Sequence, residues 1–179
     1  MAYFFVENRE GMPAITNIDS GYKPANASSY IPSAPTYPGM VARAVDPTYG
    51  EGEFILLNGC ASTLVGSIVN YNTSSFTTTL MPNTANLAQP FAIAMSANNA
   101  TTTWGWYQIS GVATILKTSV NVSPNVVLYQ SATAGRVMST AASGKQLLGT
   151  RSANAATVAS ATSTITAIID RPHMQGRVS

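Results

Sequence analysis

From about residue 50 onward, apolar and polar residues alternate in short runs, which is the period of a half-buried β-strand. Gly, Asn and Pro residues separate these runs at roughly ten-residue intervals, a spacing typical of sandwiches and barrels. No alternation of strands with helices is visible. The pattern predicts strands within residues 53–59, 62–72, 74–80, 89–97, 104–116, 125–132, 135–141, 142–155 and 157–170.

The run WGWYQISGVATIL, residues 104–116, is the most distinctive of these predicted strands. Its alternation places Trp104 and Trp106 on one side and Tyr107 on the other, with a possible kink at Gly111. Aromatic rings contribute large buried areas both in cores and in subunit interfaces. We therefore expect these three aromatic residues to lie in the core or in a subunit interface.

The first 49 residues differ in composition, because six of the ten prolines lie there among several tyrosines. Proline removes backbone donors and favours extended chain, so this segment is predicted to be an extended N-terminal arm rather than a helix. The arm either docks onto a neighbouring subunit or packs along its own domain. The predicted organisation is an arm (1–49), a single β domain (50–170) and a C-terminal tail (171–179). If the arm docks, its aromatic residues should supply the contacts: Tyr3, Phe4, Phe5, Tyr22, Tyr30 and Tyr37.

Charged residues make up only 9% of the chain and are unevenly distributed. Residues 1–53 carry a net charge of −3, residues 54–116 carry none and residues 117–179 carry +5. So low a charge suggests either a surface that is covered in an assembly or one that is polar without charge. There is no basic stripe for nucleic acid and no apolar run long enough to span a membrane, so neither partner is expected.

Residues that could carry chemistry are few. His173 is the only histidine and lies near the chain end, so a triad with Asp170 and a serine is improbable. Glu51 and Glu53 could pair for glycoside chemistry, but they flank a glycine before a strand and are better explained as edge charges. With Cys60 as the only cysteine and no calcium or phosphate-binding motif, we expect no enzyme activity, metal or cofactor.

Several segments together resemble small virion proteins of tailed bacteriophages, in particular capsid decoration (cement) proteins. They are GEFILLNGCASTLVGSIVNYN, QPFAIAMSAN, WGWYQISGVATI, SATAGRV, ASGKQLLGT and ITAIIDRPHMQG, within roughly residues 38–176. The resemblance implies an all-β domain, either a β-barrel, a β-tulip or a jelly-roll-like sandwich. It also implies a homotrimer on the outer capsid surface that bridges subunits of the major capsid protein.

Two other functions remain open at this point. One is a carbohydrate-binding or receptor-binding virion module, in which exposed aromatic residues beside ANNATTTWGWY stack on sugar rings. The other is a head-completion or tail component of the virion. Because MAYFFVENREG lacks the features of a secretion signal, we expect synthesis in the cytoplasm of the bacterial host before assembly into the virion.

Overall fold

The computed structural model describes residues 1–6, 14–16 and 38–177, and within these ranges it confirms an all-β chain without helices. The part of the chain so described contains no helix able to cross a membrane. Eleven strands form one antiparallel sheet: β1 (Phe4–Phe5), β2 (Val41–Asp46), β3 (Gly50–Asn58), β4 (Ile68–Tyr71), β5 (Thr78–Leu80), β6 (Phe91–Ala94), β7 (Trp104–Leu116), β8 (Val127–Gln130), β9 (Val137–Met138), β10 (Gln146–Ser152) and β11 (Thr164–Met174).

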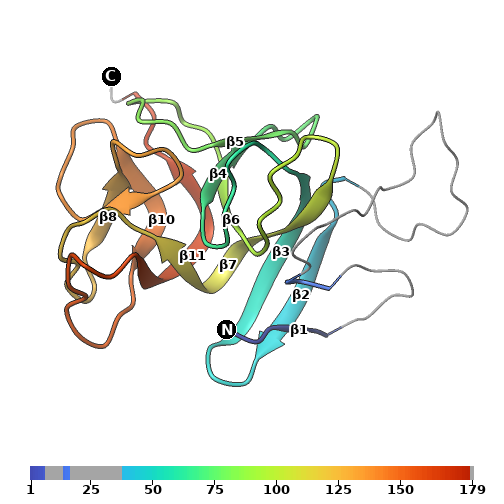
Figure 1. Ribbon diagram of the computed structural model, residues 1–179, viewed down its shortest axis with the longest axis horizontal. Coiled ribbons are helices and arrows are strands. Elements are labelled where there is room, and N and C mark those ends of the chain that lie inside the picture. Colours follow the sequence, from blue (N-terminus) through green and yellow to red (C-terminus); the bar gives the residue numbers. More distant parts are fainter. Residues whose placement is uncertain (7–13, 17–37, 178–179) are drawn as a thin grey trace, which may run out of the picture.

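The sheet is an open path and not the closed barrel that was one of the expected architectures. Its main order is β1-β2-β3-β7-β11-β10-β8-β9, with β4, β5 and β6 attached beside β7, and β1 and β9 end the path without pairing to each other. Figure 1 shows the β1–β3 ribbon on one side and the β8–β11 group on the other, with β7 between them. β7 joins the two sides, because its first part pairs with β3 and its second part pairs with β11.

The partner change occurs at Ser110, which pairs with Glu53 of β3 and with Asp170 of β11. Before this point β7 pairs with β3, with a register shift next to Glu53, and after it β7 pairs with β11. The next residue, Gly111, has a φ of 96°, a left-handed backbone conformation that residues other than glycine rarely adopt. A Cβ atom there would lie 2.6 Å from the carbonyl oxygen of Glu51. The kink expected at Gly111 therefore has a steric basis.

Three apolar clusters cover both faces of the sheet. The largest packs β4 and β6 against β7 and β11 and includes Ile68, Phe91, Ile115 and Ile165. A second lies where β3, β6 and the first half of β7 meet. A third joins the N-terminal residues to the inner face of the β1–β3 ribbon. Side chains on the two sides of β7 enter different clusters. Both sides of this strand are therefore buried, as its sequence pattern predicts.

Most predicted strands are present, but the segment 62–67 is not one of them. Ser62 and Gly66 both have positive φ values, 65° and 81°, which interrupt an extended chain. The strand expected across this region is consequently shortened to β4. Conversely, β1 and β2 lie inside the range expected for the arm, where β1 pairs with β2 and β2 pairs with β3. β11 continues into the range expected for the tail.

We predict that Gly111→Ala lowers the free energy of unfolding by about 2–4 kcal/mol, because it combines backbone strain with a clash against Glu51. Gly50→Ala is the matched control, since Gly50 has a φ of 76° but no atom beyond its chain neighbours within 4 Å of where a Cβ would lie. The control should lose only about 1–2 kcal/mol. Urea denaturation of both variants measures this, and equal losses would show that the close approach at Gly111 is unimportant.

Candidate functional site

The aromatic residues expected to make partner contacts are split by the structure. Tyr3 is buried and Phe5 is partly buried, and both pack in the cluster that contains Trp106. Phe4, between them, is 65% exposed. The other three of these residues, Tyr22, Tyr30 and Tyr37, lie outside the described residues.

Strand pairing explains this split. Phe4 is the cross-strand partner of Val45 and Phe5 is the partner of Ala44. Successive side chains of a strand point to opposite faces, so Phe5 turns inward with Ala44, which is fully buried, while Phe4 turns outward with Val45.

The outward side of β1 and β2 carries four apolar side chains in one register, and we call these four residues the ribbon face. Val45 is 42% exposed, and the others are also exposed. The backbone N–H of Val6 donates to the carbonyl of Arg43, which extends the pairing beyond β1 and keeps Val6 on this side. The ribbon face consists of Phe4, Val6, Val41 and Val45. Exposed apolar groups gathered in this way are typical of surfaces that bind another protein.

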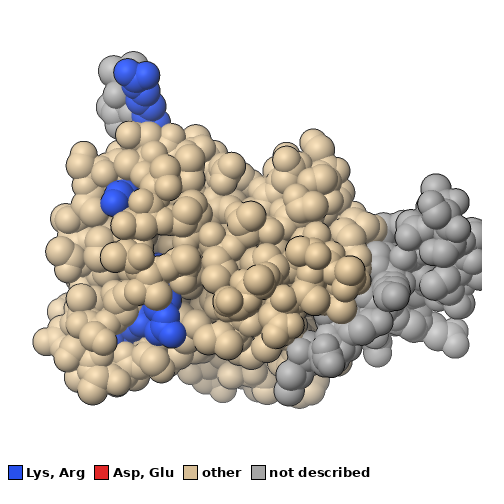
Figure 2. Space-filling model, turned by 45° about the horizontal axis from the view of Figure 1, so that its top comes forward, with Lys and Arg blue, Asp and Glu red and all other residues tan. Residues whose placement is uncertain are grey.

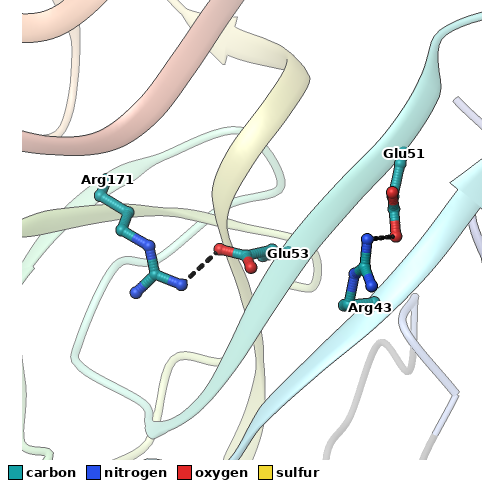
Figure 3. A network of polar contacts seen from close by, with 4 residues as sticks. All are labelled: Arg43, Glu51, Glu53 and Arg171. Atoms are coloured by element: carbon teal, nitrogen blue, oxygen red, sulfur yellow. Dashed lines mark hydrogen bonds and ion pairs between the residues drawn. The ribbon is translucent and has the colours of Figure 1, made fainter.

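Two ion pairs lie on the outward side of the ribbon (Figure 3). Arg43 stands between Val41 and Val45 on the exposed side of β2, so the first pair lies within the ribbon face. Arg43 Nη2 lies 2.5 Å from Glu51 Oε1, and Arg171 Nη2 lies 2.6 Å from Glu53 Oε2. Each glutamate that could have served in a carboxylate pair is thus occupied by its own arginine. Arg171, which lies within β11, also has a φ of 40°, a left-handed conformation that residues other than glycine rarely adopt.

The N-terminus is fixed to the ribbon by polar contacts. The backbone nitrogen of Ala2 donates to Asp46 Oδ2, and the N–H groups of Thr48 and Tyr49 donate to Asp46 Oδ1. Burial opposes ionisation of Asp46, but these hydrogen bonds outweigh it, so that the pKa of the carboxyl is lowered. The Tyr3 hydroxyl donates to the carbonyl of Val112, 2.7 Å away. The ribbon face is therefore held in a defined position.

The aromatic residues of β7 belong to the interior of this chain. Trp106 is 1% exposed and meets Phe5 edge-to-face, with ring centroids 5.2 Å apart. Trp104 is partly buried against the same cluster, and Tyr107 is fully buried on the opposite face. A ring that stacks on a sugar must be accessible, so Trp106 cannot provide such a platform.

The remaining candidates for chemistry are dispersed. His173 is exposed on β11 opposite Pro90, and Cys60 is buried as a free thiol beside Thr63. Among residues 1–6, 14–16 and 38–177, no three His, Cys, Asp or Glu side chains come close enough to hold a metal ion. The ribbon face is an exposed arrangement suited to binding a partner.

No protein-family model matches the chain, and no curated protein is significantly similar to it in sequence. The ribbon face and its ion pairs are the basis for any functional proposal, together with the sequence resemblance.

We predict that Tyr107→Phe reduces the sensitivity of the fold to alkaline pH. Burial raises the pKa of Tyr107, which donates to the carbonyl of Asn58. The unfolded chain ionises above a pH of about 10 while the folded chain does not, so stability is present below that pH and is lost as the pH rises through it.

Thermal unfolding between about pH 9 and about pH 11 tests this prediction. At neutral pH the free energy of unfolding of the variant should be about 1 kcal/mol lower, because the hydrogen bond is missing. At higher pH it should fall less steeply than that of the natural chain. Because burial also raises the pKa values of Tyr3 and Tyr71, part of the alkaline loss should remain. A profile as steep as that of the natural chain would contradict the assignment to Tyr107.

Proposed function

We propose that this protein is a structural component of a bacteriophage virion that decorates the outer capsid surface and stabilises the shell by bridging subunits of the major capsid protein. The sequence resemblance suggests the family, and the observation that carries the proposal is the exposed ribbon face. In this proposal the domain is a jelly-roll-like sandwich or β-tulip rather than a closed barrel. It performs no catalysis and uses no cofactor.

The chemistry of the ribbon face suits a protein partner. Its apolar side chains offer the area that drives association, and the ion pairs among and beside them can set the register against charges on a neighbour. Exposed ion pairs contribute only about 0–1 kcal/mol each, so Phe4 and the valines should dominate the affinity. The ordered position of β1 reduces the entropy lost on binding.

The edge of the sheet offers a second mode of contact. β1 ends the strand order, and within the described part of the chain no further strand pairs with its outer edge. Unpaired backbone groups of an edge strand can accept a strand from another chain. We propose that this edge and the neighbouring apolar face contribute to self-association as a homotrimer and to contacts with the coat.

A head-completion or tail component would use the same kind of surface and differs in its place on the virion. The carbohydrate-binding alternative is less well supported, because Trp106 is buried and Trp104 packs against the cluster around it.

We predict that the double variant Phe4→Ser, Val45→Thr binds particles at least about tenfold more weakly than the natural chain, because it removes two of the four apolar side chains of the ribbon face. Both positions are exposed and Thr keeps the β-branched shape, so the fold should be retained. The measurement is occupancy on capsids that lack the native protein, as a function of added protein.

The matched control is Val127→Thr on β8, since Val127 is 41% exposed and Val45 is 42% exposed. It should decorate capsids as fully as the natural chain. Equal binding by the double variant and the natural chain would remove the ribbon face from the proposal.

We also predict that the protein has the mass of three 18.7 kDa chains in solution and is present in the virion in numbers comparable to the coat protein. Light scattering after size exclusion and quantitative mass spectrometry of purified virions give these two values. A monomer both in solution and on the particle would overturn the trimer, and only a few copies per virion would place the protein at the tail.

A further inference from the structure

A second surface feature lies at the other end of β7, away from the ribbon face. It is a pocket of about 420 Å³ between three segments, residues 117–119, 133–136 and 160–163. Arg136 and Lys117 are its charged lining residues, and neither an Asp nor a Glu lines it.

We propose that this pocket binds a tetrahedral oxyanion, that is, the phosphate or sulfate group of a ligand. This proposal does not depend on the proposed virion function.

The first support is positive charge without a counter-charge. Within the described residues, the two ion pairs join Arg43 to Glu51 and Arg171 to Glu53, and neither Lys117 nor Arg136 takes part in one. Arg136 Nη1 donates to the carbonyl of Lys117, 3.0 Å away, and this is the one hydrogen bond that the guanidinium makes to described residues. Its other N–H groups are free to bind an anion in the fork geometry that phosphate and sulfate accept well.

Lys117 acts from beneath the pocket. It is 1% exposed, and its ammonium donates to the carbonyls of Thr118, Val120 and Ser160 at 3.3, 2.8 and 3.4 Å. Thr118 and Ser160 belong to two of the segments around the pocket, and Val120 follows the first of them, so the ammonium both joins these segments and neutralises oxygen atoms that would repel an anion. Desolvation by burial lowers the pKa of Lys117. A bound anion would offset that cost.

The second support is a set of hydroxyl groups without protein partners. Apart from Thr118, five Ser and Thr residues line the pocket from all three segments, and none of their hydroxyls makes a hydrogen bond to the described residues. They are Ser119, Thr133, Ser160, Thr162 and Ser163. Donors that come from several directions suit the four oxygens of a tetrahedral group better than the two oxygens of a planar carboxylate.

Charge on the wider surface is consistent with an anionic ligand. Figure 2 shows a face whose described atoms include isolated basic groups and no acidic ones. The acidic residues of the described chain lie instead in or next to β2 and β3 and in β11 (Asp46, Glu51, Glu53 and Asp170). An approaching anion therefore meets little repulsion at the pocket.

The test is a titration of the isotope-labelled full chain with inorganic phosphate, sulfate and acetate at constant ionic strength, followed by amide NMR signals. Phosphate and sulfate should cause saturable shifts in residues 117–119, 133–136 and 160–163, and acetate should bind more weakly. A preference for phosphate would identify a phosphate ester as the natural group, and a preference for sulfate a sulfate ester. Equal or stronger binding of acetate, or the absence of saturable shifts in these segments, would overturn the proposal.

Variants assign the binding to the pocket. Arg136→Gln should weaken phosphate binding by about tenfold. Thr162→Ala with Ser163→Ala, at two exposed positions, should weaken it less while leaving the fold intact. Arg151→Gln, an exposed arginine on β10, is the matched control and should bind as the natural chain does. If both pocket variants bind phosphate like the control, the pocket is not the site.

Discussion

The close approach of β7 to β3 at Gly111 is the constraint on which the rest of the structure depends. Only glycine leaves room for the Glu51 carbonyl and also adopts the left-handed backbone found there. At the preceding residue β7 is paired to both β3 and β11, and beyond it the strand belongs to the β11 side alone. The bend lets one long strand serve two groups of strands, so the sheet has apolar clusters on both faces and remains open.

The sequence predicts much of this fold because the alternating pattern of side chains is clear in strands that pack on both faces. β6 is an example, since Phe91 and Ile93 enter one cluster and Ala92 and Ala94 enter another. The sequence does not predict β2, for the opposite reason. Its inward residues are the small Ala42 and Ala44, its outward residues include valines, and it follows a Pro-rich stretch, so its pattern does not indicate a buried strand. The open sheet could not be predicted either, because its strand order joins segments far apart in the sequence, which the local pattern does not indicate.

At the candidate site, too, the sequence alone does not predict which single residues are exposed. Tyr3, Phe4 and Phe5 are equivalent as a sequence of aromatic residues, and pairing with β2 decides which of them is exposed. A one-residue shift of that register would bury Phe4 and expose its neighbours. The hydrogen bonds of Asp46 to Ala2 and to the following turn hold the register in place. The polar anchor thus determines the apolar surface, although nothing in the local sequence links the two.

The fold brings together charges of opposite sign that are far apart along the chain. The acidic N-terminal part and the basic C-terminal part meet where Glu53 pairs with Arg171, 118 residues apart in sequence. At that end of the sheet the charges are matched, whereas Lys117 and Arg136 at the far end of β7 have no carboxylate partner among the described residues. Seven residues separate Ser110 from Lys117 along the chain, roughly 23 Å in an extended strand. Because continuous pairing between β7 and β11 spans most of this length, an apolar surface and an anion-binding pocket would be held at a fixed separation. A rigid connection would fix the distance between two bound partners, whereas a flexible connection would leave that distance variable.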